Sequence, residues 1–377
     1  MVSCRLQYAT IVAIVRMKGL SKILQSFTNS DGGSDRVVGI DIGSSSIKVV
    51  ELENKKGTIS LVTYGELQTG PYAGQEIGQS VILDVKQEQA AMIDVLRESA
   101  VQAKQAVFSM SLASSFVTNI NFEAEDTANL ESRVRVEARK VIPVSLSEVA
   151  LDWAEVEFER DKDEKDTTRS IMIAAIQNDS LQRFRVLMQF VGLPNPPTEI
   201  ECFSAIRSLY NSNESHMAVV DIGAQSAKMY IAHNGMLARM HRLRAGGALV
   251  TKRLAGVLEQ SFEAVELTKR TITRDDERFR DVQRAHISCY ERSFSEFRQV
   301  IREYEQRSGI TLDVVYLTGG GGVFPGVQSK LQDELGTEVL KANPFSKVAY
   351  PAFMEDTMFS IGPSFVVAIG AALRQFE

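Results

Sequence analysis

The sequence predicts an α/β protein made of two related half-domains, because one short pattern occurs twice. In the first copy an apolar run, residues 37–40, leads into Asp41 and then into Ile-Gly, three serines, Ile and Lys. In the second copy the apolar run 218–220 leads into Asp221, which lies 221 − 41 = 180 residues after the first Asp. A third turn of small residues, 319–326, also follows an apolar run. Three such turns after strands predict a ligand site that the two halves share.

The residue types of these turns suit phosphate binding. Gly and Ser leave backbone N–H groups and hydroxyls free to face phosphate oxygens, and Lys48 adds a positive charge. A carboxylate repels phosphate, so the expected role of Asp41 is to hold a hydrated divalent cation beside it. The alternative is a Gly-Ser hairpin with an incidental Asp, and the repetition of the pattern weighs against that alternative.

Length and composition limit the classes of protein to which the chain can belong. A chain of 377 residues is long enough for two or more domains with sizeable cores. The 48 acidic residues outnumber the 42 Lys and Arg, so we expect no nucleic-acid partner. Three scattered Cys and four His offer neither a disulfide framework nor a zinc site, which favours a reducing cytoplasm.

The first 35 residues are expected to form an amphipathic segment and a linker, 1–35. The apolar run 8–15 is too short to span a bilayer and lacks the features of a signal peptide, and Met17 is an alternative start. Residues 20–27 place their apolar side chains on one helical face, and 29–34 have linker composition. This helix packs either on its own domain or on a membrane or partner, and both readings stay open.

In the first half, residues 65–78 are expected to be turn-rich, 87–106 to form a helix with one apolar side, and 106–111 to form a strand. An insertion then starts with an acidic helix, 126–140, and a strand, 147–153. The charge run 159–169 is expected at a solvated hairpin tip, and a helix at 180–191 closes the insertion.

The second half continues with a Gly pair, Gly246 and Gly247, which opens a helix whose N–H groups could face an anion or a ribose hydroxyl. Residues 271–308 are expected to be helical with a buried apolar stripe, and the small residues 365–373 to form a helix that crosses a counterpart near Ala205. The expected units are 36–115 (first half-domain, completed by 193–217 and 356–377), 116–192 (inserted subdomain), 218–255 (second half-domain, completed by 309–355) and 256–308 (helical subdomain of the second half).

The three turns together resemble those of the ATPase superfamily of actin, Hsp70 and the sugar kinases. The resemblance narrows at residues 137–143, a helix that ends in Ile-Pro, and at the acidic-apolar strand 147–153. Both are similar to the inserted subdomain of the PilM family, the actin-like type IV pilus assembly proteins. Because residues 171–175, 180–194 and 199–206 match as well, the resemblance runs nearly end to end. It implies an actin-like (ribonuclease H-like) fold with an inserted subdomain in each half.

The resemblance also implies ATP and Mg²⁺ as ligands. In the family two Asp-x-Gly hairpins hold the phosphates, a Gly-Gly turn lies against adenosine, and a helical Glu and Lys lie beside the nucleoside. A surface ion pair is the alternative for these last two residues. The expected metal ligands are Asp41 and Asp221, and the expected nucleotide contacts are Gly43, Ser44, Ser45, Ser46, Lys48, Gly223, Ala224, Gln225, Gly246, Gly247, Glu266, Lys269, Gly319, Gly320, Gly321 and Val323.

The second hairpin departs from the family pattern. Family members usually continue with an acid, Ser, Thr and Asp, whereas this chain has Gln225 followed by Ser, Ala and Lys. Gln225 can orient a water molecule but cannot accept its proton, so we expect weak hydrolysis or none. Gln225 and Glu201 are the candidate catalytic residues.

The resemblance further implies a partner, because PilM holds a short cytoplasmic peptide of the inner-membrane protein PilN between the inserted subdomain and the first half. Residues 141–151, with Arg139 and Lys140 at the rim, are the expected groove, although Ile142 and Leu151 also suit an ordinary core. The chain is then cytoplasmic and peripheral at the inner membrane, with other pilus assembly proteins and a homo-oligomer left open.

Two other functions stay open. An FtsA-like division filament protein would carry an amphipathic membrane helix after its last domain, whereas the amphipathic piece here is N-terminal, at residues 20–27. A small-molecule kinase of the same superfamily needs an Asp base beside a sugar pocket. No convincing candidate for that base lies between the first hairpin and the crossing helix.

Overall fold

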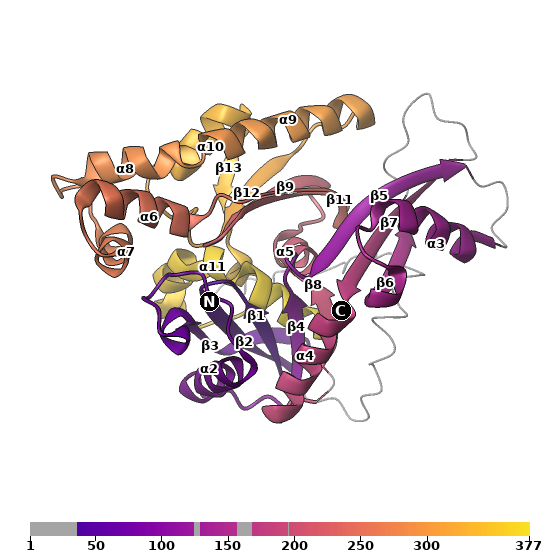
Figure 1. Ribbon diagram of the computed structural model, residues 1–377, viewed down its shortest axis with the longest axis horizontal. Helices are drawn as coiled ribbons and strands as arrows, with labels where there is room; N and C mark the ends of the chain where they lie inside the picture. The colour runs from indigo at the N-terminus through magenta and orange to yellow at the C-terminus, as the bar shows by residue number, and fades with distance from the viewer. Residues whose placement is uncertain (1–35, 124–128, 157–167, 195) are drawn as a thin grey trace, which may run out of the picture.

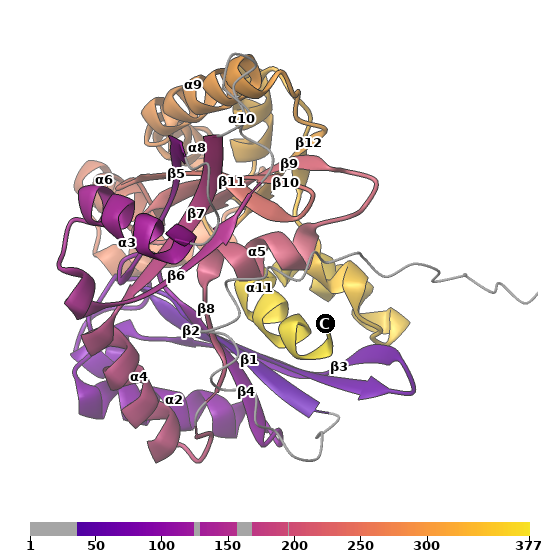
Figure 2. The same cartoon turned by 90° about the vertical axis from the view of Figure 1, so that its right-hand side faces the viewer.

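A computed structural model describes residues 36–123, 129–156, 168–194 and 196–377. Two five-stranded sheets lie one above the other with two helices, α5 and α11, between them, and a three-stranded sheet lies to one side (Figures 1 and 2). The expected N-terminal helix and linker, and the charge run up to residue 167, lie outside the described residues.

The first sheet contains the first hairpin. Strand β1 pairs antiparallel with β2 and parallel with β4, and helices α2 and α4 cover the outer face of the sheet (Figure 1). An Asp84 and Gln87 capping box fixes the start of α2. In sheet order the strands are β3 (Thr58–Gln68), β2 (Ser46–Lys55), β1 (Arg36–Ile42), β4 (Gln105–Met110) and β8 (Thr198–Ile200), and the helices are α2 (Val85–Glu98) and α4 (Asn178–Phe190).

The second sheet repeats this topology, which confirms the predicted duplication. Strand β9 takes the place of β1, with an antiparallel neighbour on one side and a parallel one on the other. The register is also the same, because Asp41 lies opposite Lys48 on β2, and Asp221 lies opposite Lys228 on β10. In sheet order the strands are β11 (Met236–Leu243), β10 (Ala227–His233), β9 (His216–Ile222), β12 (Val314–Thr318) and β13 (Val339–Lys341).

The three-stranded sheet lies in the predicted inserted subdomain and has its own apolar core beneath α3. Its order, β5-β7-β6, leaves β5 at the edge next to the second half and β6 at the other edge. Helix α4, which the predicted insertion 116–192 includes, packs on the first sheet, since Phe184 stacks on Phe108 with ring centroids 3.6 Å apart. The elements are β5 (Ser115–Glu123), α3 (Leu130–Val141), β6 (Val149–Glu155) and β7 (Thr168–Gln177).

Helices α5 (Glu201–Leu209) and α11 (Glu355–Leu373) cross between the two large sheets. Their backbones touch, because a Cβ atom added to Gly370 would lie 1.8 Å from the Ser204 carbonyl oxygen. The stretch Ala352–Phe376 is long and apolar enough to cross a membrane. Of its apolar 18-residue window, 67% is buried inside the fold, which identifies α11 as a core helix.

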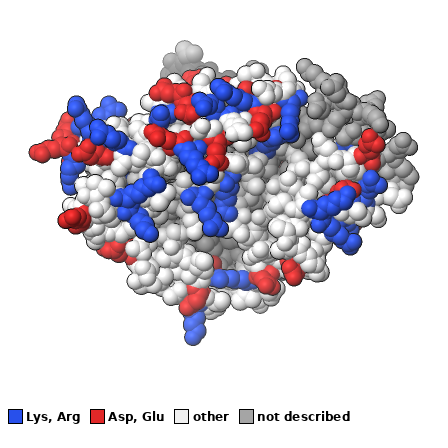
Figure 3. All heavy atoms as spheres, turned by 45° about the horizontal axis from the view of Figure 1, so that its top comes forward, with Lys and Arg blue, Asp and Glu red and all other residues white. Residues whose placement is uncertain are grey.

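The outer part of the second half is helical. Phe294, Phe297, Ile301 and Tyr304 form the buried stripe of α9, as predicted, and Val300 is partly buried beside them. Acidic and basic side chains intermingle on the face of the molecule in Figure 3. Arg292 and Glu296 of α9 form one ion pair, at 2.8 Å. The helices are α6 (Gly247–Leu258), α7 (Phe262–Thr271), α8 (Phe279–Ser288), α9 (Glu291–Ser308) and, next to β13, α10 (Val327–Leu335).

Three predicted elements have wrong bounds. The helix expected over 87–106 ends at Glu98, and a left-handed Ala100, with φ 51°, separates it from β4. The turn-rich region expected from residue 65 is strand β3 as far as Gln68. The last helix is predicted to begin near 365, because a proline normally ends a helix, but α11 begins at Glu355 and runs through Pro363.

Candidate functional site

A cavity of about 540 Å³ lies between the two halves, where both hairpins and the third turn meet. It is bordered by the ends of β1 and β9 and by α7 and α11. Of the predicted site residues, all except Gly246 line this cavity: Asp41, Gly43, Ser44, Ser45, Ser46, Lys48, Glu201, Asp221, Gly223, Ala224, Gln225, Gly247, Glu266, Lys269, Gly319, Gly320, Gly321 and Val323.

The two hairpin turns have the same backbone geometry. The Gly43 N–H donates to the Ser46 carbonyl at 2.9 Å, and the Gly223 N–H donates to the Ser226 carbonyl at 3.0 Å. Small side chains in both turns leave the backbone open to the cavity. The duplication therefore presents two equivalent turns to one ligand.

The charged side chains around the first turn leave the Asp41 carboxylate available to a ligand. Lys48, directly opposite Asp41 in the ladder, donates to Ser46 Oγ at 2.7 Å and pairs with Glu66 at 3.5 Å. Among the residues that the structure describes, none forms a hydrogen bond or ion pair with the Asp41 carboxylate. Burial raises the pKa of Asp41 to about 6 against the opposing charge of Lys48.

The second turn is arranged differently. Lys228 Nζ lies 3.0 Å from Asp221 Oδ2 and 2.6 Å from Glu201 Oε2. Burial alone would lower the pKa of Lys228, but the two carboxylates outweigh it and raise the pKa above its ordinary value. Lys228 is therefore a fixed positive charge between these two acids.

The two candidate catalytic residues differ in how far contacts within the protein engage their side chains. The Leu112 N–H donates to the second oxygen of Glu201 at 2.8 Å, so both Glu201 oxygens are engaged. Gln225 is exposed at the rim of the cavity. The arrangement thus offers Gln225 to orient a water molecule and no free carboxylate at Glu201 to accept its proton.

Glu266 and Lys269 do not form the surface ion pair considered above as an alternative. Their side chains are 7% and 10% exposed, and Lys269 Nζ lies 2.5 Å from Glu266 Oε2. Burial would raise the pKa of Glu266, but Lys269 holds it below its usual range. Thr251 donates to the same carboxylate at 2.6 Å, which fixes the pair in the cavity wall.

The start of α6 differs from the prediction that its N–H groups could face an anion. The Gly247 N–H donates to the Gly223 carbonyl and the Ala248 N–H to the Ala224 carbonyl, both at 2.9 Å. A Cβ atom on Gly246 would lie 2.3 Å from the Ala224 carbonyl oxygen. This Gly pair therefore packs the helix against the second turn, and the predicted contact of these N–H groups with a ligand is wrong.

The third turn requires glycine. Gly319 has φ +83°, and a Cβ atom there would lie 2.4 Å from both Asp221 Oδ1 and the Ile222 carbonyl oxygen. The Gly319 N–H donates to the Pro363 carbonyl at 2.8 Å, and the Thr318 hydroxyl donates to the same oxygen. The turn is thus held against both the second hairpin and α11.

Sequence reasoning missed His286, which lines the cavity behind the third turn. Its ring stacks on Phe324 with centroids 4.2 Å apart, and Nε2 lies 3.2 Å from the Gly321 carbonyl oxygen. Glu66 and Lys228 were also given no role. The signal for Lys228 was its place in the repeated pattern, whereas nothing local marks Glu66 or His286.

The buried imidazole gives a pH-dependent prediction. Burial lowers the pKa of His286 to about 3, so the folded protein holds it neutral. Below pH 6.5 the histidine is protonated in the unfolded chain but stays neutral in the folded protein. The free energy of unfolding therefore decreases as the pH is lowered. Between pH 7.5 and 4.5 the wild type should lose about 2.5 kcal/mol more than His286→Phe, measured by urea unfolding. His241→Phe, at a partly exposed histidine, is the control, and equal pH slopes for wild type and His286→Phe would contradict this prediction.

The cavity residues fit a magnesium ion that keeps most of its water. Within the described ranges no three His, Cys, Asp or Glu side chains gather as a metal centre. Mg²⁺ needs no such centre, because it binds through one or two carboxylates together with substrate phosphates. Asp41 has no protein partner in the described chain, so its carboxylate is a suitable ligand for the ion. Asp221 forms an ion pair with Lys228.

The duplicated sheets, crossing helices and facing turns define a protein of the actin-like ATPase fold. The model of the family "Type IV pilus assembly protein PilM" matches residues 39–376, and the chain therefore belongs to the PilM family. The chain is similar to a solved PilM-PilN type IV pilus biogenesis complex, with a TM-score of 0.75 and 23% identity over 90% of this chain and 98% of that one. It also resembles MreB5 of Spiroplasma citri bound to AMPPNP, with a TM-score of 0.51 and 9% identity over 92% and 97% of the two chains. The cell division protein FtsA of Bacillus subtilis is 23% identical and covers 84% of this chain and 81% of its own length.

Proposed function

We propose that this chain binds ATP with Mg²⁺ and serves as an actin-like scaffold of type IV pilus assembly, cytoplasmic and peripheral at the inner membrane. The observation that carries this proposal is the convergence of two equivalent Gly-Ser hairpins and a glycine turn on one cavity between the halves. A nucleotide in that cavity would contact both halves at once.

Within this proposal the two hairpin turns and Lys48 hold the phosphates, and Glu266, Lys269 and the third turn form the nucleoside wall. Asp41 would hold the hydrated Mg²⁺ with help from Asp221, and the bound ion would supply positive charge that offsets the charge of the phosphates. Because Lys228 and the Leu112 N–H engage Glu201, hydrolysis is slow at best.

The proposed partner is a short cytoplasmic peptide of an inner-membrane protein, bound on the inserted subdomain. Strand β6 is an edge of its sheet, and the segment before it exposes Val141 and Val144. An edge strand can pair with an added peptide through main-chain hydrogen bonds. Arg139 and Lys140 are exposed at the end of α3, and they would attract an acidic residue of the peptide. The solved relative is itself a complex of PilM with PilN, which supports a PilN-like partner.

Titration of the full chain with the N-terminal peptide of the neighbouring pilus-assembly membrane protein tests this site. We expect saturable binding, and we expect Arg139→Glu with Lys140→Glu to weaken it at least about 10-fold, since a close charge pair at an interface contributes more than about 1.4 kcal/mol. The matched control is Lys252→Glu with Arg280→Glu, an equal charge change on exposed residues of the second half. The peptide site is refuted by a lack of binding, or by equal weakening in both double variants.

A further inference from the structure

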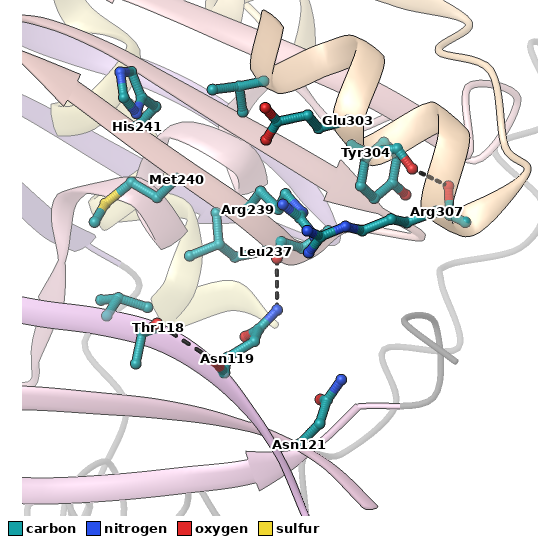
Figure 4. Close-up of a pocket in the computed structure, with 14 residues that line it drawn as sticks. Thr118, Asn119, Asn121, Leu237, Arg239, Met240, His241, Glu303, Tyr304 and Arg307 are labelled. Atoms are coloured by element: carbon teal, nitrogen blue, oxygen red, sulfur yellow. Dashed lines mark hydrogen bonds between the residues drawn. The ribbon is translucent and has the colours of Figure 1, made fainter. Parts of the chain in front are cut away.

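A second cavity, of about 550 Å³, lies between the inserted subdomain and the second half (Figure 4). Strand β5 forms one side, strand β11 the other, and helix α9 the roof. It shares no lining residue with the cavity between the hairpins. Nothing in the proposed function uses it.

The two strands face this cavity with their edges. Each is the terminal strand of its sheet, β5 next to β7 and β11 next to β10. Each strand contributes a consecutive run of lining residues, 117–119 on β5 and 237–241 on β11, and Asn121 of β5 lines the cavity as well. Successive side chains of a strand point to opposite faces, so a consecutive run lines a cavity only where the strand presents its edge. Unpaired backbone N–H and C=O groups of both strands are therefore directed at this space.

The two edges approach but do not pair. The described strand pairing contains no ladder between β5 and β11. A side chain makes the contact instead, because Asn119 Nδ2 donates to the Ala238 carbonyl at 2.5 Å (Figure 4). This contact satisfies one carbonyl of β11, that of Ala238.

The polar side chains of the cavity carry a positive excess. Arg239 of β11 and Arg307 of α9 lie side by side with their guanidinium groups toward the space, and Glu303 is the acid that lines it (Figure 4). Arg307 is exposed and forms no ion pair with any described residue. Val117, Leu237 and Val300 supply an apolar lining beneath these charges.

We propose that this cavity binds an extended peptide segment of another protein, with alternating apolar and acidic residues, as an added strand on the edge of β11. Main-chain hydrogen bonds to β11 hold the peptide, its carboxylates pair with Arg307 and Arg239, and its apolar side chains pack toward Val300, which is only partly buried. The hydrogen bond from the Asn119 side chain to the Ala238 carbonyl breaks when the peptide binds. This surface is at the opposite edge of the three-stranded sheet from β6, so it is separate from the peptide groove proposed above.

A fluorescent synthetic probe of alternating Val and Glu, eight residues long, tests the proposal by fluorescence anisotropy with the full chain. We expect saturable binding that weakens at least 10-fold with Arg307→Glu, and the same variant should favour a Val-Lys probe. A Val-Glu probe methylated on alternate backbone nitrogens keeps every side chain but loses main-chain donors, and we expect it to bind at least 10-fold more weakly.

Three outcomes overturn the proposal. The first is no saturable binding of the Val-Glu probe up to 1 mM, and the second is an affinity that Arg307→Glu leaves unchanged. The third is equal binding of the methylated probe, which would make the cavity an anion site without strand pairing. Lys252→Glu is the matched control, an equal charge change on an exposed residue of the second half, and should leave this binding unchanged. A loss with Arg139→Glu and Lys140→Glu would place the probe in the β6 groove instead.

Discussion

Replacement of Asp41 by alanine should lower magnesium-dependent ATP affinity about 100-fold, since a group that positions metal-bound water contributes up to that factor. The carboxylate has no protein partner among the described residues, so its removal leaves no ion-pair partner unsatisfied and should not unfold the chain. Calorimetric titration with ATP, in Mg²⁺ and again in EDTA, measures the effect. It should be done at pH 8, where a carboxyl group with a pKa of about 6 is ionised.

Asp221→Ala is the matched comparison, because it lies at the same position of the second copy. Asp221 is bound to Lys228, so this variant should lose stability as well as affinity. A folded Asp41→Ala protein with wild-type affinity in Mg²⁺ would show that the metal is held elsewhere or not at all.

Replacement of Lys228 by methionine should destabilise the ligand-free protein by about 3 kcal/mol, since it leaves Asp221 and Glu201 unpaired and largely buried. Methionine keeps the length of the side chain, so the loss reports the charge. Without lysine, Asp221 and Glu201, which both contact Lys228 Nζ in the wild type, can bind a divalent cation, and binding to the folded state raises stability. Millimolar Mg²⁺ should therefore raise the urea midpoint of Lys228→Met, and much less that of the wild type.

Lys48→Met is the control, because its ladder position is identical while its acid, Glu66, is 35% exposed and 3.5 Å away. We expect a loss of about 1 kcal/mol or less there. If Lys228→Met is as stable as Lys48→Met, or if Mg²⁺ fails to restore it, then Lys228 is not the charge that holds the two acids together.

The repeated pattern predicted the duplicated fold and the two hairpin turns of the cavity, because Asp-Ile-Gly followed by small residues gives the same turn in both copies. The difference between Lys48 and Lys228 could not be predicted. Both occupy the same position in the pattern and the same register. Their partners decide the outcome, and these come from distant elements, Glu66 on β3 and Glu201 on α5.

Other errors have local causes. Strand β3 is partly exposed along most of its length. Its sequence therefore lacks the alternation of apolar and polar residues that marks a half-buried strand. The Gly246 and Gly247 pair has the composition of an anion site, but the second hairpin already accepts the N–H of Gly247. Composition alone does not show whether a donor has been used within the protein.

Pro363 has a further consequence for how the halves move. Its carbonyl accepts hydrogen bonds from Gly319 and Thr318, so the third turn is tied to α11, which itself packs against α5 across the midline. A change in the angle between the halves would then displace the glycine turn and alter the width of the cavity that we propose for the nucleotide. On that proposal, nucleotide affinity and interdomain angle are two measures of one equilibrium. We expect any partner that prefers the open angle to weaken nucleotide binding by the same factor by which nucleotide weakens that partner.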